Sequence, residues 1–310
     1  GNLFGITGGE GTGKSNYVAA IVAGCICPAG ADIDTLGIQI TANGRHKAVL
    51  LYDTEQSEVQ LFKNVSNLLA RAKQPDKPDE LKAFCLTGMS RKERLNAIVQ
   101  SMDKFYYQYG GIQLVVIDGI ADLVKSANDE AESVAVIDEL YRLAGIYNTC
   151  ILCVLHFVPN GLKLRGHLGS ELQRKAATIL SIEKDDEPAQ SVVKALKVRD
   201  GSPLDVPLML FAWDKEAGMH VYKGEKPREE KEKRKERELV NVAHDIFGRQ
   251  TRITYIDLCE QLQQVLDIKE RTAKSYIRFM RERDIITKDT ANQSCFVIGS
   301  YHLQRNASCP

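Results

Sequence analysis

Apolar residues follow two alternating patterns along the first half of the chain. Short uninterrupted apolar runs, which predict buried strands, lie at residues 3–7, 47–53, 83–87, 112–118 and 149–156. Stretches with apolar side chains at helical spacing lie between them, at about 15–26, 57–73, 91–108 and 128–147. This alternation predicts an α/β fold with a doubly wound, mainly parallel sheet.

The pattern changes twice in the second half. Residues 178–222 contain closely spaced strand-like runs, which predict an antiparallel extension of the same sheet. Residues 223–238 then carry eight basic and six acidic side chains and almost nothing apolar. We interpret this stretch as a solvated linker that becomes helical where it enters the next domain; the alternative is a specific polyanion-binding segment.

A small unit follows the charged stretch. Its pattern predicts three helices and then two strands, at about 237–247, 254–266, 269–283, 285–288 and 295–298. Three helices followed by a β-hairpin is the order of a winged helix. The predicted organisation is therefore a doubly wound α/β domain over 1–222, a charged linker over 223–236, a small α+β, winged-helix-like domain over 237–303 and a tail over 304–310.

Composition adds little to this picture. The chain is 44% apolar and 26% charged with a formal net charge of zero, which is the balance of an ordinary globular protein and gives no overall nucleic-acid signal. The sequence contains no run of 18 apolar residues, so it predicts no membrane span. Cys150 and Cys153 are three apart on a predicted strand, so they face opposite sides and cannot jointly hold a metal. We interpret the eight cysteines as thiols of a reducing cytoplasm.

One motif carries specific chemistry. The pattern G-x-x-x-x-G-K-[ST] is matched by the run Gly8, Gly9, Glu10, Gly11, Thr12, Gly13, Lys14 and Ser15. The glycines let successive N–H groups point at phosphate oxygens, the lysine places a cation between phosphates, and Ser15 can ligate Mg²⁺. A strand precedes the motif and a helix follows it, as a phosphate-binding P-loop requires. ATP and Mg²⁺ are the expected cofactors.

Two further strands end in acids at the same predicted edge of the sheet. The run Gln113–Asp118 is apolar and ends in Asp118, which is the pattern of a magnesium-side acid near a P-loop. The run Val49–Glu55 ends in Asp-Thr-Glu, and Glu55 is placed to orient and deprotonate an attacking water. The alternative for Glu55 is a surface turn carboxylate.

The order of the P-loop, a strand ending at Glu55 and a strand ending at Asp118 resembles the RecA/DnaB-like ATPases. That resemblance implies a RecA-like P-loop NTPase fold with Glu55 as the catalytic base and His156, at the end of the next strand, as a polar sensor. The segment Leu164–Ser170 is similar to the Arg-Gly-rich segment of RepA-type hexameric helicases of plasmids and mobile elements. For His156 the alternative is an ordinary core or loop histidine.

The segment Leu196–Gly201 resembles the K-x-R-x-G segment of hexameric replicative helicases. The resemblance implies that Lys197 and Arg199 reach the γ-phosphate of a neighbouring subunit, with Arg199 as an arginine finger. Residues two apart on a strand share a face, so both cations can point at one anion. The alternative is a pair of cations on the solvated face of an edge strand.

Two groups of basic residues are candidates for nucleic-acid binding. The predicted loop from Phe157 to Arg174 carries Lys163, Arg165, His167 and Arg174, which suits a single-strand phosphate track. The third helix of the small unit has six cations against two acids, and Arg271, Lys274 and Arg278 are expected on its outer face. A mobile surface loop and a helix for protein contacts are the respective alternatives.

Three functions fit these features. The first is a DNA-dependent motor, a RepA-like homo-oligomeric helicase acting on single-stranded DNA, for which the resemblance implies a hexamer. The second is a non-motor ATP-switched DNA-binding protein of recombination, transposition or repair. The third is an NTPase that acts on a protein partner. Strand unwinding separates the first function from the second, and stimulation of hydrolysis by single-stranded DNA separates both from the third.

Overall fold

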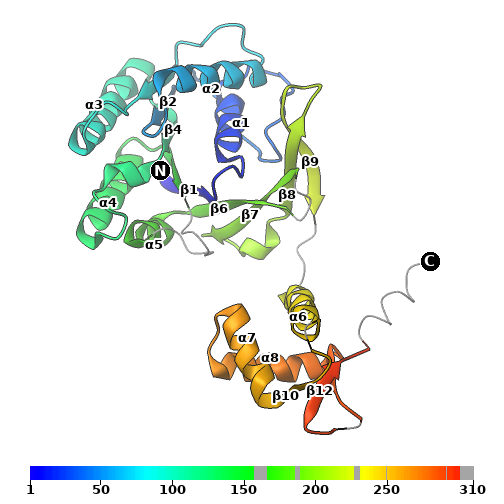
Figure 1. Ribbon diagram of the computed structural model, residues 1–310. Coiled ribbons are helices and arrows are strands. Elements are labelled where there is room, and N and C mark those ends of the chain that lie inside the picture. The colour runs from blue at the N-terminus through cyan, green and yellow to red at the C-terminus, as the bar shows by residue number, and fades with distance from the viewer. Residues whose placement is uncertain (157–165, 186–188, 227–230, 249, 291, 301–310) are drawn as a thin grey trace. The chain divides into compact units, whose positions relative to one another are not determined.

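The computed structural model describes the chain except for residues 157–165, 186–188, 227–230, 249, 291 and 301–310, and except for the side chains of 231–234. The chain forms two compact units, Gly1–Pro227 and Arg228–Pro310 (Figure 1). Each is described by itself below. No helix of the described part is long and apolar enough to cross a membrane.

The first unit is built on a nine-stranded sheet of order β3-β2-β4-β5-β1-β6-β7-β8-β9. The strands are β1 (Asn2–Gly8), β2 (Ala48–Asp53), β3 (Leu81–Cys85), β4 (Ile112–Asp118), β5 (Cys150–His156), β6 (Thr178–Lys184), β7 (Gln190–Val198), β8 (Leu208–Asp214) and β9 (Met219–Lys226). The strands from β3 to β6 along the sheet are parallel, and β7, β8 and β9 extend it antiparallel. The predicted doubly wound, mainly parallel α/β fold is confirmed, with strands that follow the apolar runs closely.

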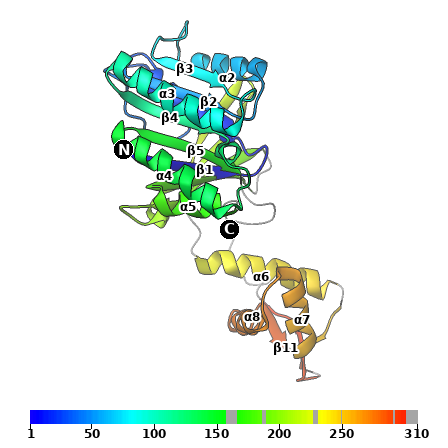
Figure 2. The same cartoon turned by 90° about the vertical axis from the view of Figure 1, so that its left-hand side faces the viewer.

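Helices cover both faces of this sheet. They are α1 (Lys14–Ile26), α2 (Glu58–Arg71), α3 (Arg91–Tyr109), α4 (Glu130–Ile146) and α5 (Gly166–Lys175), with short 3₁₀ turns η1 (Ile120–Leu123) and η2 (Pro203–Asp205). One core cluster joins α3, α4 and α5 to the sheet, and a second joins α1 and α2 to the other face. Figure 2 shows α3, α4 and α5 on the face turned to the viewer.

Local sequence explains why the strands and helices end where they do. β2 is buried at every position, as its unbroken apolar run predicts for a central strand. α3 begins with a capping box in which Ser90 and Glu93 satisfy each other's backbone N–H groups, and it ends at Gly110, which has a left-handed φ of 65°. Cys153 lies in one core cluster and Cys150 packs against the other, so the two thiols face opposite sides of β5.

Two expectations about this unit need correction. The loop predicted from Phe157 to Arg174 is shorter, because α5 begins at Gly166. Leu168 and Leu172 are buried in the core at helical spacing, but only Gly169, Ser170 and Glu171 lie between them, and two apolar positions are too few to reveal a helix in the sequence. The charged stretch becomes helical as expected, but the limits of the linker differ from 223–236, because β9 extends to Lys226 and α6 begins at Lys231. Exposed helices and edge strands tolerate charge, so composition alone could not set these limits.

The second unit packs three helices around a small antiparallel sheet. Its elements are α6 (Lys231–Phe247), β10 (Ile253–Thr254), α7 (Tyr255–Leu266), α8 (Glu270–Glu282), β11 (Ile286–Lys288) and β12 (Cys295–Ile298). The sheet has the order β10-β12-β11. Sequence reasoning missed β10, because two residues carry no periodicity; the strand exists through the pairing of Ile253 with Phe296.

Candidate functional site

The Gly-rich loop connects β1 to α1 at the carboxyl edge of the parallel strands. Gly11 and Gly13 have φ values of 66° and 95°, which favour glycine. Lys14 is only 8% exposed, and its Nζ donates hydrogen bonds to the carbonyls of Gly8 (3.0 Å) and Gly9 (2.6 Å). Burial lowers the pKa of Lys14, against the opposing effect of nearby acids, of which Asp118 is the strongest. The loop is thus preformed around a cation at a helix N-terminus.

A side chain of β8, Phe211, packs against the Gly-rich loop. A Cβ on Gly13 would lie 2.8 Å from Cε2 of Phe211, closer than real Cβ contacts. The Phe211 ring also lies 6.0 Å from that of Tyr17 on α1 and 5.7 Å from that of His220 on β9. Glycine at position 13 is therefore required both by its backbone conformation and by this close approach.

The acids end neighbouring strands beside the loop. Asp53 of β2 pairs in register with Asp118 of β4. Asp53 Oδ1 accepts hydrogen bonds from the backbone N–H groups of Glu55 (3.0 Å) and Gln56 (2.8 Å), which fixes the turn that presents Glu55. Thr54 Oγ1 donates to the carbonyls of Asp118 (3.0 Å) and Gly119 (2.9 Å), so the two strand ends are tied together.

The protein surroundings of Asp118 by themselves disfavour the ionised form of its carboxyl group. Burial, then the charges of Asp53 and Glu55, raise its pKa to about 7, and Lys14 only partly offsets them. A carboxylate held among other carboxylates gains most from a divalent cation. The donor set therefore fits Mg²⁺ at Asp118 and Ser15.

His156 joins this group from β5. The strand lies between β1 and β4, and His156 pairs in register with Gly8. Its Nε2 lies 3.5 Å from Oε2 of Glu55, and both side chains are about one-third exposed, at 33% and 38%. The structure thus brings Lys14, Glu55, Asp118 and His156 to one edge of the sheet, although they lie on four different segments.

This arrangement agrees with a family comparison. The family model described as AAA domain matches residues 1–160, just over half of the chain. The chain belongs to the AAA-domain family. It is accordingly a nucleotide-binding P-loop ATPase, and the matched region contains the loop and the ends of β2, β4 and β5. No curated protein matches the chain.

Magnesium binding in the AAA domain requires oxygens beyond the protein's own. Among the described residues, no cluster of three or more His, Cys, Asp or Glu side chains is suited to a metal ion. Mg²⁺ characteristically takes one or two protein oxygens together with substrate phosphates and water. Ser15 and Asp118 would hold the ion in that way.

Lys197 and Arg199 lie away from the Gly-rich loop of their own chain. β7 runs antiparallel to β6, so its end pairs with Thr178, the first residue of β6, while Gly8 pairs with Ile182. Thr178 and Ile182 are four residues apart on β6, which is about 13 Å along the strand. Lys197 Nζ donates to the carbonyls of Gln173 (2.7 Å) and Arg174 (3.1 Å), and Arg199 donates to that of Lys175 (2.9 Å). The cations thus cap the C-terminus of α5, and β7 lies inside the sheet rather than at its edge.

The two described candidates for nucleic-acid binding in the first unit, His167 and Arg174, lie in opposite end turns of α5. Lys163 and Arg165 lie outside the described residues. His167 is exposed in the first turn of α5. Arg174 is in the last turn of that helix and pairs with Glu171 at 2.6 Å, so its expected place in a loop near His167 is wrong.

The candidate residues of the second unit share one helix face. Arg271, Lys274 and Arg278 are exposed on α8, whose buried side chains are Ala273, Ile277 and Met280. Lys274 pairs with Glu270 at 2.7 Å and Arg278 with Glu282 at 2.9 Å. Both ion pairs join exposed side chains, so breaking either pair costs little free energy.

Sequence analysis missed the aromatic residues of β8 and β9. Trp213 shares a face of β8 with Phe211, is 55% exposed and lies 5.5 Å from the ring of His220. No local signal connects these residues to the Gly-rich loop, which is about 200 positions earlier. The local signal for these residues was the apolar run of β8, Leu-Met-Leu-Phe-Ala-Trp-Asp, which contains Phe211 and Trp213.

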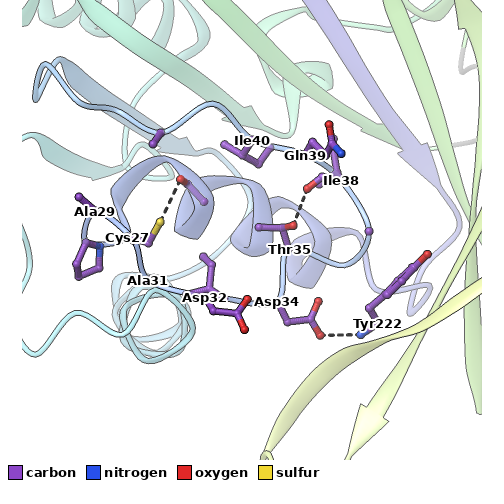
Figure 3. Close-up of a pocket in the computed structure, with 16 residues that line it drawn as sticks. Cys27, Ala29, Ala31, Asp32, Asp34, Thr35, Ile38, Gln39, Ile40 and Tyr222 are labelled. Atoms are coloured by element: carbon purple, nitrogen blue, oxygen red, sulfur yellow. Dashed lines mark hydrogen bonds between the residues drawn. The ribbon is translucent and has the colours of Figure 1, made fainter.

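A cavity of about 690 Å³ lies apart from this site (Figure 3). Its walls are the segment after α1, the end of α1 at Gly24 and Cys27, and Tyr222 of β9. Asp34 accepts hydrogen bonds there from the N–H groups of Leu36 (2.8 Å) and Tyr222 (2.7 Å). The lining contains no residue of the Gly-rich loop, so this cavity is not the nucleotide site.

Proposed function

We propose that this AAA-domain protein is an ATP-dependent, DNA-acting ATPase that works as an oligomeric helicase or motor, similar to the RepA-type helicases of plasmids and mobile elements. The observation that carries the proposal is the convergence of Lys14, Asp118, Glu55 and His156 at one sheet edge. That convergence supplies a phosphate clamp, a magnesium-side acid and a water-activating base.

Each side chain has a definite task in the proposed hydrolysis. Lys14 and the loop N–H groups hold the phosphates, and Glu55 accepts the proton of the attacking water. His156 holds the Glu55 carboxylate through the 3.5 Å contact and responds to the γ-phosphate. Bound Mg²⁺ supplies charge neutralisation at the phosphate oxygens. Ser15 and Asp118 hold that ion.

Oligomer formation is part of the proposal. Arg stabilises charge on a transferring phosphoryl group, and such an arginine can come from a neighbouring subunit. Lys197 and Arg199 lie where the parallel strands begin, opposite the carboxyl ends that carry their own Gly-rich loop, and donate hydrogen bonds to the end of α5. Their position is therefore better suited to a neighbour's nucleotide than to their own.

Two features support DNA as the partner. The sequence places Lys163 and Arg165 between His156, the last residue of β5, and Gly166, the first residue of α5. In the second unit, three helices and a sheet of order β10-β12-β11 support the winged-helix proposal, with the exposed cations of α8 available for phosphates.

The test is steady-state ATP hydrolysis with and without single-stranded DNA, for wild type, Lys14→Ala and Arg199→Ala. We expect DNA to raise the wild-type rate several-fold and both variants to lose hydrolysis. A wild-type rate that DNA leaves unchanged would overturn the DNA-acting function. Unwinding of a forked duplex by the same preparation separates a motor from an ATP-driven switch.

A further inference from the structure

A second cavity of the first unit opens at the carboxyl ends of the parallel strands, where the candidate nucleotide site also lies. It has a volume of about 490 Å³ and lies between the turn from β3 into α3 and the segment after η1. Its lining residues are Met89, Ser90, Arg91, Arg94, Ala121, Asp122, Val124, Lys125, Ser126 and Ala127. Both segments follow the carboxyl ends of parallel strands, where ligands of such sheets bind.

Arg94 lines this cavity and is held in place by hydrogen bonds to both of its walls. Its Nε donates to the carbonyl of Leu86 (3.0 Å), and its terminal nitrogens donate to the carbonyls of Thr87 and Asp122, each at 3.3 Å. It also pairs with the Asp122 carboxylate at 3.6 Å, and its side chain is 15% exposed. Arg94 therefore holds the two walls together and neutralises the acid of the lining.

Two cations of the lining are left without a counter-charge. Arg91 and Lys125 are exposed, one on each wall, and neither forms an ion pair within the described part of the chain. Glu132 accepts a hydrogen bond from the backbone N–H of Lys125, not from its ammonium group. With Arg94 and Asp122 paired, the lining has an excess of two positive charges.

Hydroxyl groups stand beside the two cations. Ser90 Oγ accepts a hydrogen bond from the N–H of Glu93, and Ser126 Oγ accepts one from the N–H of Asn128 at 3.2 Å. A serine that accepts such a bond keeps its own hydrogen for donation. The cavity thus offers two cations and two hydroxyl donors, the groups that bind phosphate oxygens. Met89, which is 40% exposed, adds an apolar rim.

We propose that this cavity binds one nucleotide of a single-stranded nucleic acid, with the phosphate held by Arg91 and Lys125 and the sugar or base against Met89. The inference rests on the proposed DNA-acting function and assigns it a contact point outside the basic residues considered above. The shared chemistry is a phosphate group, which could also come from free phosphate, and the position beside the open edge and the apolar rim favours a polymer backbone.

The experiment measures binding of a fluorescently labelled oligothymidylate to the full chain by anisotropy at several salt concentrations. The variants are Arg91→Ala, Lys125→Ala and, as the matched control, Lys92→Ala, which removes an exposed cation of the same helix turn that does not line the cavity. We expect each lining variant to bind about three- to tenfold more weakly and the salt slope to fall by about 0.7. Lys92→Ala should bind within about twofold of wild type, and all three should keep DNA-independent hydrolysis.

The outcomes separate this inference from the function on which it rests. If wild type binds no oligothymidylate, the proposed function and the inference both fail. If wild type binds and the lining variants bind as well as Lys92→Ala, only the inference fails. Inorganic phosphate is the second ligand tested: if the lining variants lose affinity for phosphate but not for oligothymidylate, the cavity is a free-phosphate site and the nucleic-acid assignment is overturned.

Discussion

His156 Nε2 at the end of β5 lies 3.5 Å from Glu55 Oε2 beyond the end of β2, so the two side chains meet across the strand between them, β4. The contact links the residue beside Gly8 to the carboxylate best placed to activate water. A change in either side chain should therefore affect hydrolysis rather than nucleotide binding.

Replacement of the base tests this relationship directly. Glu55→Gln keeps the shape but cannot accept a proton, so we expect hydrolysis to fall by about 100-fold or more with ATP affinity unchanged. His156→Ala should lower hydrolysis by about tenfold, because Glu55 loses its partner. Phosphate release and equilibrium nucleotide binding measure the two effects. His46 is the matched control, because its ring also pairs with a glutamate, Glu80, at 2.8 Å. His46 is not part of the candidate site, so His46→Ala should hydrolyse ATP normally.

The raised pKa of Asp118 predicts a pH-dependent stability. Folding raises this pKa from 3.8 to about 7, so the native state binds the proton more tightly and loses stability as pH rises between these values. Asp118→Asn removes this cost, and we expect it to stabilise the nucleotide-free protein by about 1–3 kcal/mol more at pH 8 than at pH 4.

Thermal or urea unfolding across that pH range provides the measurement for Asp118→Asn. Wild type, unfolded under the same conditions, is the reference for this difference. Equal effects of Asp118→Asn at both pH values would contradict the electrostatic account.

The close approach of Phe211 to Gly13 predicts a difference between two glycines of one loop. Gly11 and Gly13 both have positive φ, but a Cβ on Gly11 has no atom within 4 Å, whereas one on Gly13 meets the Phe211 ring. Gly11→Ala should cost only the backbone strain, about 1–2 kcal/mol. Gly13→Ala should cost more and remove ATP-induced stabilisation in a thermal shift assay. Similar results for the two variants would show that the ring moves aside freely.

The separation of Arg199 from its own loop predicts complementation between variants. Arg199→Ala and Lys14→Ala should each lose ATP hydrolysis, and a one-to-one mixture should recover about a quarter of the wild-type rate if protomers mix at random. The recovered sites combine an intact loop from one protomer with Arg199 of another. Arg174→Ala, which removes a cation paired within α5, should hydrolyse ATP normally. An inactive mixture would leave Arg199 as a helix-capping residue only.

Trp213 predicts an optical signal for nucleotide binding. It is the single tryptophan, it is half exposed, and it shares a strand face with Phe211 under the Gly-rich loop. We expect Mg²⁺-ATP to change its emission saturably in wild type and to leave it unchanged in Lys14→Ala. A saturable change that persists in Lys14→Ala would place the responding nucleotide elsewhere.

Several features followed from the sequence by itself. The Gly-rich motif, the apolar runs and their alternation with helical stretches predicted the parallel core and the edge that holds Lys14, Glu55 and Asp118. These are local signals, since backbone conformation and burial impose a period or a residue type on neighbouring positions.

Other features depend on contacts between distant segments, and only the tertiary structure decided them. Phe211 meets Gly13, Lys197 and Arg199 meet the end of α5, and Arg94 joins two loops into a cavity. None of these pairings imposes a pattern on adjacent residues, because each depends on the order and direction of strands in the sheet. The same reason explains why β10 and the start of α5 were missed: their stability comes from partners elsewhere in the chain.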